Sequence, residues 1–164
     1  MRALTAKDPV TGLPDRSFLD KELAALDGAA PAVVAMVDID DMVQINQRSS
    51  FADGDAVLRA VAVTVRASVR PEESVIRFSA DEFVVIMPDR TLEEAAEVMG
   101  GVVNAVTRLP HDRAHGATVS IGVIVVEPGE GAESVLVRVD DVTAEAKHRG
   151  GSQVAVFPTT PAPR

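Results

Sequence analysis

The sequence predicts an α+β domain in which a mixed, mainly antiparallel, ferredoxin-like sheet is flanked by helices. Strand-like and helix-like segments alternate along the 164 residues, which is typical of strands joined by covering helices. One pair of strands is separated only by a short polar turn, so these two strands are expected to be antiparallel neighbours. This hairpin excludes a purely parallel, doubly wound sheet and favours a mixed one.

Composition and charge restrict the class of protein. With 46% hydrophobic residues the chain can form one domain with a full core, built largely from aliphatic residues because aromatic residues make up only 3%. The formal net charge of −9 argues against a nucleic-acid partner, which needs clustered Lys and Arg. The absence of Cys excludes disulfides and thiolate metal sites. No apolar run approaches the roughly 18 residues of a membrane segment, so a cytoplasmic protein is the simplest expectation.

The first half of the chain predicts three helices and a strand before the hairpin. Asp15 is placed to cap a helix that runs to Leu26, and a buried strand is expected over 32–37. A short helix around Met42 precedes a long helix over 54–69. Apolar residues of the long helix recur along one face: Val57, Leu58, Val61 and Val65.

The second half begins with the hairpin strands 74–78 and 83–87. Thr91 and Glu94 have the spacing of a capping box, which predicts a helix over 92–108 whose middle is weakened by two glycines. The remaining expected elements are a strand over 117–126, a helix over 134–149 and a strand over 153–157. We expect one domain over 1–157 and a disordered, proline-rich tail over 158–164.

Two acidic sites lie where predicted strands end. Asp81 and Glu82 occupy the hairpin turn, and the segment 38–41 (Asp-Ile-Asp-Asp) closes the strand over 32–37. Carboxylates from two neighbouring strands suit Mg²⁺, which prefers oxygen ligands and is commonly shared with nucleotide phosphates. The alternative is that Asp38 ends a strand and Asp81 lies in a solvated turn, because acids are common in turns.

His111 and His115 have the spacing of two metal ligands on one helix turn. Pro110 and Gly116 flank them, which predicts a loop rather than a helix. We therefore do not expect a metal site there.

Several motifs occur in the order and spacing of one known family. Residues 8–16, Asp-Pro-Val-Thr-Gly-Leu-Pro-Asp-Arg, are similar to its opening Asp-x-Leu-Thr-Gly-Leu-Pro-Asn-Arg. Residues 79–83, Ser-Ala-Asp-Glu-Phe, stand at the signature, and 120–123 and 140–147 resemble a later strand and the last helix. The chain from 8 to about 154 thus resembles the GGDEF family, the diguanylate cyclase domains that join two GTP molecules into cyclic di-GMP. The resemblance implies a nucleotidyl cyclase or palm-type sheet.

The resemblance implies a metal and catalytic site at the two acidic segments. Asp38, the carbonyl of Ile39 and Asp81 would bind Mg²⁺. Asp81 and Glu82 would be the catalytic carboxylates, with the metal offsetting the charge of the triphosphate.

The resemblance also assigns substrate contacts. Asp55 would accept hydrogen bonds from guanine, Asn46 would complete this recognition, and Lys147 would bind the phosphates. The alternative for Asp55 is a first-turn acid favoured by the helix dipole, which is compatible with guanine recognition. Arg70 and Glu73 stand where many members bind cyclic di-GMP as an inhibitor, but a polar connection between helix and strand is slightly favoured.

Four departures from the family pattern concern the phosphate region. Ser79 and Ala80 replace two glycines, which supply positive φ and close backbone approach, so the turn is either strained or differently shaped. Val43 and Gly151 replace a usual Lys and a usual Arg. Losing well-placed cations typically lowers turnover by about 10²–10³ each, although such losses are not additive.

We therefore expect a degenerate GGDEF domain that binds GTP and Mg²⁺, makes little or no cyclic di-GMP, and acts as a regulatory or dimerisation module. One alternative is an active diguanylate cyclase in which a homodimer faces two GTP-loaded half-sites. The other is an interaction domain that binds no nucleotide. The expected partners are GTP, cyclic di-GMP, and a second copy or another signalling domain.

Overall fold

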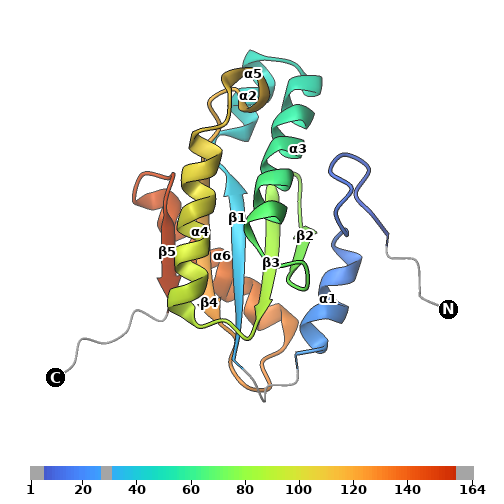
Figure 1. Cartoon of the computed structure of the whole chain (residues 1–164), viewed down its shortest axis with the longest axis vertical. Helices are drawn as coiled ribbons and strands as arrows, with labels where there is room; N and C mark the ends of the chain where they lie inside the picture. The colour runs from blue at the N-terminus through green and yellow to red at the C-terminus, as the bar shows by residue number, and fades with distance from the viewer. Residues whose placement is uncertain (1–5, 27–30, 158–164) are drawn as a thin grey trace.

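The computed structural model describes residues 6–26 and 31–157, which form a five-stranded mixed sheet with helices on both faces (Figure 1). The strand order is β2-β3-β1-β4-β5. The strands are β1 (Ala32–Ile39), β2 (Ser74–Arg77), β3 (Glu82–Pro88), β4 (Val119–Val125) and β5 (Val154–Phe157). β1 is antiparallel to both β3 and β4, and only β5 is parallel to its neighbour. The predicted mixed α+β sheet is confirmed.

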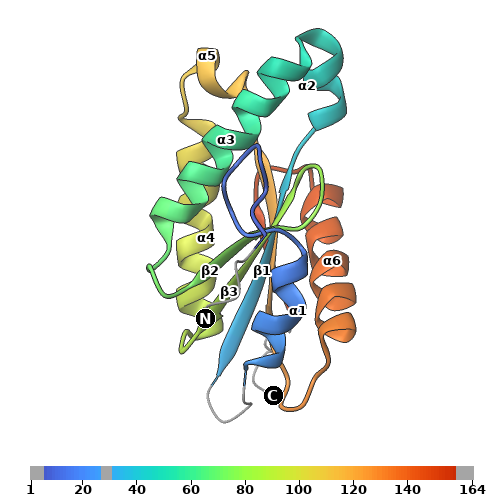
Figure 2. The ribbon, with the colours of Figure 1, turned by 90° about the vertical axis from the view of Figure 1, so that its right-hand side faces the viewer.

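Six helices complete the described chain: α1 (Ser17–Ala24), α2 (Met42–Arg48), α3 (Phe51–Ser68), α4 (Leu92–Thr107), α5 (His111–Ala114) and α6 (Ala132–His148). Seen along the sheet, α3 and α4 cover one face, and α1 and α6 cover the other (Figure 2). No helix of the described residues is long and apolar enough to cross a membrane.

The central strand β1 is buried on both faces of the sheet. Because side chains alternate along a strand, Val33, Ala35 and Val37 pack in the core under α3 and α4. Val34 and Met36 pack in the second core, under α1 and α6. The nearly continuous apolar run of β1 follows from this double coverage.

The two long helices on the first face begin at capping boxes. The Thr91 hydroxyl accepts from the Glu94 N–H at 3.2 Å, and the Glu94 carboxylate accepts from the Thr91 N–H at 2.9 Å, as the sequence pattern predicts. Ser50 and Asp53 form the same reciprocal pair at the start of α3. α3 therefore begins three residues before the predicted Gly54.

Several predicted boundaries differ from the structure. The Asp15 carboxylate does accept from the Ser17 N–H, but Arg16 is the N-cap and α1 ends at Ala24, before Leu26. Residues 111–114 form a single helical turn rather than the expected loop. The predicted tail over 158–164 lies outside the described residues.

The close approach of α6 to β4 depends on a glycine. A Cβ added to Gly122 would lie 2.5 Å from the Thr143 N and Oγ1 atoms and 2.9 Å from the Val139 carbonyl oxygen. These distances are too short for any other residue. Gly122 therefore sets how closely the helix that carries Lys147 lies against the sheet.

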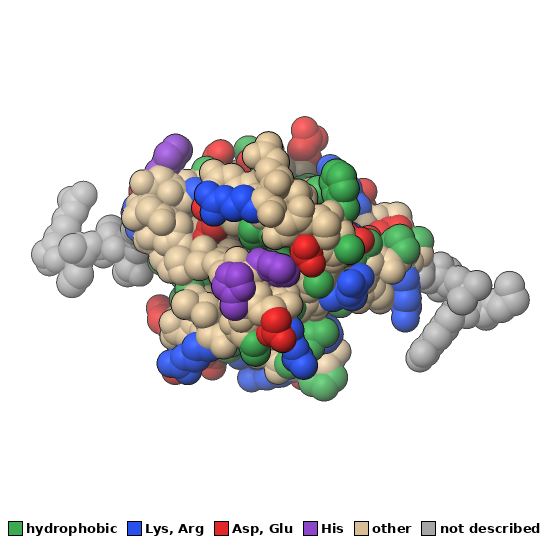
Figure 3. All heavy atoms as spheres, turned by 90° about the horizontal axis from the view of Figure 1, so that it is seen from above, with side chains coloured by type: hydrophobic (Ala, Val, Ile, Leu, Met, Phe, Trp, Pro, Cys, Tyr) green, Lys and Arg blue, Asp and Glu red, His purple; other side chains and the backbone are tan. Residues whose placement is uncertain are grey.

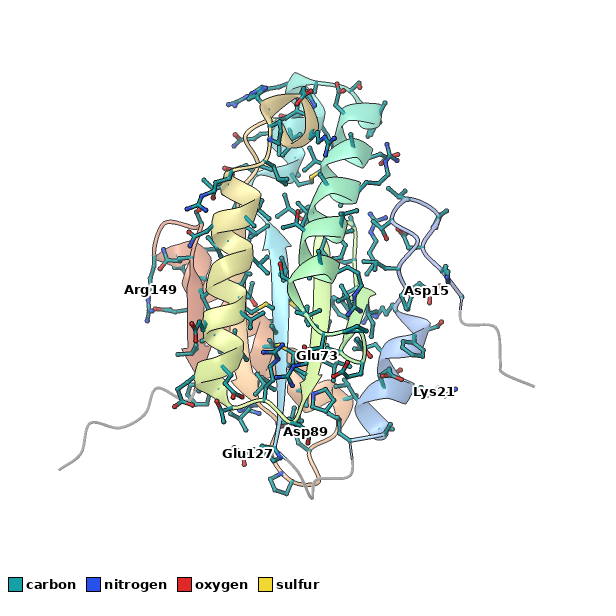
Figure 4. The ribbon with its side chains drawn as sticks, in the orientation of Figure 1. Asp15, Lys21, Glu73, Asp89, Glu127 and Arg149 are labelled. Atoms are coloured by element: carbon teal, nitrogen blue, oxygen red, sulfur yellow. The ribbon has the colours of Figure 1, made fainter. Side chains whose placement is uncertain are left out.

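A buried ion pair joins the entry to β2 with the exit from β3. Glu73 is 1% exposed, and its carboxylate accepts from Arg90 Nε at 2.6 Å, Arg90 Nη2 at 2.7 Å and the Arg70 N–H at 2.7 Å. Figure 4 shows Glu73 at the lower end of the sheet, away from α2 and α5. Burial raises the pKa of Glu73, but the hydrogen bonds from Arg90 and Arg70 outweigh it and lower the pKa.

Replacing Arg90 by Met is expected to destabilise the fold by about 3–5 kcal/mol, because the buried Glu73 carboxylate loses its counterion. Urea unfolding at pH 7 measures this change. The matched control is Arg149→Met, which breaks an exposed pair with Glu145 and is expected to cost about 0.5 kcal/mol or less. The Arg149 side chain points away from the sheet in Figure 4.

The pH dependence gives a second test of the same pair. Because the pKa of folded Glu73 is lowered, its stabilisation is present above the unfolded pKa of about 4.5 and is lost as the pH falls through the folded value. Acidification from pH 5 to strongly acidic pH should therefore lower the free energy of unfolding less in Arg90→Met than in wild type. The two losses should differ by about the destabilisation that the substitution causes at pH 7. Equal acid losses in both proteins would contradict this role of the pair.

Candidate functional site

The two acidic segments meet at one end of the sheet. In the strand register, Asp38 of β1 lies opposite Glu82 of β3 and opposite Ser120 of β4. The Ile39 N–H donates to the Asp81 carbonyl at 3.0 Å, so the hairpin tip is joined to the end of β1. The structure therefore brings together the four residues expected at the metal and catalytic site.

Asp38 has the most perturbed environment of these residues. Its side chain is only 16% exposed, and its Oδ1 atom is buried without a hydrogen-bond partner, although Lys147 Nζ lies 3.2 Å away. Burial raises the pKa of Asp38 to about 6; the Lys147 charge opposes this rise, and the charges of Asp81 and Glu82 add to it. The carboxylate is thus only partly compensated by the protein.

Lys147 extends from the last turn of α6 toward two carboxylates. Its Nζ atom lies 3.2 Å from Asp38 Oδ1 and 3.5 Å from Asp40 Oδ1. Burial lowers the pKa of the ammonium group, but Asp38 and Asp40 outweigh burial and raise the pKa. The side chain is still 37% exposed, so the ammonium group can reach a ligand at the surface.

The residues at the end of β1 fit a divalent cation in part. The orphaned Asp38 oxygen is the kind of hard ligand that Mg²⁺ prefers. Over residues 6–26 and 31–157, however, no three His, Cys, Asp or Glu side chains are grouped to hold a metal ion. A magnesium ion here would therefore need further oxygen ligands, such as backbone carbonyls, water or the phosphates of a nucleotide.

The hairpin tip has a different geometry from a strained glycine turn. Ser79 and Ala80 are not among the non-glycine residues with positive φ, so the turn avoids left-handed strain. The Ser79 hydroxyl donates to the Glu82 carboxylate, and the N–H groups of Phe78 and Ser79 donate to the Glu82 carbonyl. The Arg77 guanidinium donates to the Ser79 and Ala80 carbonyls at 3.2 and 2.8 Å. Side chains thus hold the turn that glycines form in the family pattern.

Arg77 also ties the hairpin tip to the opening motif. Its Nη1 atom donates to Asp8 Oδ1 at 2.9 Å, and its backbone N–H donates to the Pro14 carbonyl at 3.0 Å. The other Asp8 oxygen accepts from the N–H and hydroxyl of Thr11. Burial raises the pKa of Asp8, but the Thr11 and Arg77 hydrogen bonds outweigh it and lower the pKa. Sequence analysis did not identify this ion pair, which joins residues 69 positions apart.

The residues expected to recognise guanine lie on α2 and α3. A Cβ on Gly54 would come within 2.0 Å of Asn46 Oδ1, so Asn46 packs directly on the α3 backbone beside Asp55. Only glycine at position 54 permits this contact. The glycine therefore brings Asn46 close to the residue with which it would act.

The two departures expected to remove positive charge are on the surface near this end of the domain. Val43 on α2 is 69% exposed. Gly151 has φ of +73°, and a Cβ there would lie 3.2 Å from Asp40 Oδ2. An arginine at 151 would thus need a different turn. Seen from above, this end shows acidic, basic and histidine side chains interspersed rather than one charged patch (Figure 3).

The remaining candidates lie apart from the end of β1. Arg70 and Glu73 precede β2, whereas the hairpin tip follows it, and both Glu73 oxygens are used by the ion pair with Arg90 and the Arg70 N–H. His115 Nε2 lies 3.7 Å from Asp53 Oδ1 near the start of α3. Neither group contributes to the acidic site.

Comparison with known proteins identifies the family. The family model described as "Diguanylate cyclase, GGDEF domain" matches residues 5–153. The chain is 33% identical over 162 residues to the response regulator PleD of Caulobacter vibrioides and 32% identical over 164 residues to the diguanylate cyclase DgcP of Pseudomonas aeruginosa. These alignments cover 92% and 94% of this chain but only 36% and 24% of the relatives.

Solved structures show the same fold. The GGDEF domain of DgcB from Caulobacter crescentus, solved in complex with c-di-GMP, superposes with a TM-score of 0.86 at 26% identity and 97% coverage of both chains. The diguanylate cyclase SiaD of Pseudomonas aeruginosa, solved with its activator SiaC, gives a TM-score of 0.84 at 28% identity, covering 92% of this chain and 61% of SiaD. The chain belongs to the GGDEF domain family of cyclic di-GMP signalling.

Proposed function

We propose that this GGDEF domain binds GTP with Mg²⁺ but has little or no diguanylate cyclase activity, and that it acts as a regulatory or dimerisation module. One observation carries the binding part: the buried Asp38 Oδ1 atom has no well-formed hydrogen bond, and only the charge of Lys147, 3.2 Å away, compensates it at the sheet edge shared with Asp81 and Glu82. A carboxylate with this environment favours a bound cation over solvent.

Each protein group has a distinct part in the proposed binding. Asp38, the Ile39 carbonyl and Asp81 would hold the metal, which when bound supplies charge neutralisation at the triphosphate. Lys147 would exchange its contacts with Asp38 for contacts with phosphate oxygens. The Asp55 carboxylate would accept hydrogen bonds from guanine, and the Asn46 amide would complete the recognition that selects this base.

The proposed loss of turnover comes from the hairpin tip and from missing cations. The Ala80 Cβ adds volume where the family has only backbone, and the Ser79 hydroxyl occupies a Glu82 oxygen that would otherwise be free for catalysis. Val43 and Gly151 provide no charge to stabilise the phosphates in the transition state. A displacement of about 1 Å at Asp81 would lower the rate about a hundredfold.

An active cyclase is the principal alternative, and the relatives named as diguanylate cyclases favour it. In that case a second copy of the domain would present the other GTP. A nucleotide-free interaction domain is a further alternative, which the contact of Lys147 with Asp38 favours because it already neutralises part of the acidic charge.

Arg70 and Glu73 are proposed to be structural rather than a site for cyclic di-GMP. The Glu73 carboxylate is saturated by Arg90 and the Arg70 N–H, so a ligand would have to displace a buried ion pair.

Titration calorimetry of the domain with GTP and Mg²⁺, followed by chromatography of the same mixture, tests the proposed function. The expected result is GTP binding that requires Mg²⁺ and no cyclic di-GMP. Product at the rate of an intact family member would contradict the proposed loss of turnover. No detectable binding would contradict nucleotide recognition.

Replacing Asp55 by Asn is expected to reduce the preference for GTP over ATP by about tenfold or more, because a site that hydrogen-bonds guanine discriminates strongly against a base that lacks the matching donors. Competition calorimetry with the two nucleotides measures the ratio. Asp141→Asn, an exposed acid on α6, is the control and should leave the ratio unchanged. An unchanged ratio in the Asp55 variant would remove this residue from the site.

Replacing Ser79 and Ala80 together by glycine is expected to raise cyclic di-GMP formation by about tenfold or more, because the change frees Glu82 and removes the Cβ of residue 80. Chromatographic rate assays at saturating GTP measure the gain. The single variant Ser79→Ala separates loss of the hydroxyl from removal of the second Cβ. A double-glycine variant as slow as wild type would show that the missing cations, not the turn, limit turnover.

A further inference from the structure

Asp40 directly follows β1, and its environment differs from that of Asp38 near the end of the strand. Its side chain is 13% exposed, and its carboxylate accepts from Thr118 Oγ1 and Ser120 Oγ at 2.7 Å each and from the Ser152 N–H at 3.1 Å. Lys147 Nζ lies 3.5 Å from Asp40 Oδ1. Four donors from three elements therefore surround one carboxylate.

These contacts join β1, β4 and the connection between α6 and β5. The residues of this connection, Gly150, Gly151 and Ser152, all have positive φ. The Gly150 and Gly151 N–H groups donate to the Lys147 and Ala146 carbonyls at the end of α6, whereas Ser152, a non-glycine residue at positive φ, is held by a bond from outside the turn. The bond from Ser152 to Asp40 spans 112 residues and fixes the turn against the sheet.

Hydrogen bonding distinguishes Asp38 from Asp40. Each Asp40 oxygen accepts at least one hydrogen bond from the protein, whereas Asp38 Oδ1 accepts none. A carboxylate with its lone pairs engaged by protein donors is a poor metal ligand. It is well suited to orient neighbouring groups, as partners behind metal ligands do.

We propose that Asp40 is a positioning residue: it binds neither metal nor substrate, and it holds Lys147 and the 150–152 turn at the distance from Asp38 needed for triphosphate binding. This inference rests on the proposed function, because it assigns Lys147 to the phosphates. The Gly151 departure supports it, since a side chain there would press on the Asp40 carboxylate.

The test compares Asp40→Asn with the exposed control Asp141→Asn. Calorimetry measures the affinity for GTP with Mg²⁺ and, separately, for guanosine, which has no phosphates. NMR of the nucleotide-free domain measures hydrogen exchange of the Ser152 amide and the side-chain ammonium signal of Lys147 at one fixed pH. A positioning role predicts a loss confined to the triphosphate ligand together with changes at Ser152 and Lys147 in the nucleotide-free domain, whereas a metal ligand predicts only the loss of GTP binding.

Asp40→Asn is expected to weaken GTP binding by about 10–100-fold, to leave guanosine binding unchanged, and to speed Ser152 exchange. If Asp40→Asn unfolds the domain, Thr118→Val removes one donor without changing side-chain shape. It should weaken GTP binding in the same direction, with Thr64→Val as its control because the Thr64 hydroxyl bonds only within α3.

The outcomes separate this inference from the proposed function. If wild type binds no GTP but Ser152 exchange and the Lys147 signal still change in Asp40→Asn, the proposed function fails and the positioning of Lys147 stands. Unchanged GTP affinity in both Asp40→Asn and Thr118→Val overturns the inference. Equal losses for GTP and guanosine also overturn it, because they indicate a general structural role.

Discussion

The rest of the structure depends on the antiparallel register of β1 between β3 and β4. Burial on both faces holds this strand in place, because a slip of one residue would exchange its two sets of core side chains. That register aligns Asp38 with Glu82 on one side and Ser120 on the other. The acidic end of the sheet is therefore a direct consequence of how the core packs.

Charge at this end is balanced unequally. Lys147 lies between two carboxylates, of which Asp40 is supplied with hydrogen bonds by its neighbours and Asp38 is not. The Asp38 carboxyl group therefore keeps a raised pKa. A bound nucleotide and metal would bring the contacts that compensate its charge. The proposed metal ligand and the proposed positioning residue are thus two residues apart, at the end of β1 and directly after it.

The hairpin tip shows how a family signature can change without disrupting the fold. Arg77 binds the carbonyls of Ser79 and Ala80 and reaches Asp8 of the opening motif, so the turn keeps a defined shape without glycine. The turn thus has a defined position, while the Ala80 Cβ occupies space beside it and the Ser79 hydroxyl binds the Glu82 carboxylate. The fold of the domain can therefore be kept whatever the hairpin tip does chemically.

The sequence by itself determined the hairpin, and with it a mixed sheet, and the capped helix after Thr91, because periodicity, capping and turn chemistry are local. The meeting of the two acidic segments was expected from the strand ends and from the resemblance to the family, and the register of β1 shows it. It did not show that α3 begins at Phe51, that residues 111–114 form a helical turn, or how the Ser79 turn avoids positive φ. The Glu73–Arg90, Arg77–Asp8 and Asp40–Ser152 contacts were decided only by tertiary structure. Each joins residues far apart in the chain, and a local pattern carries no information about which distant donor reaches a given carboxylate.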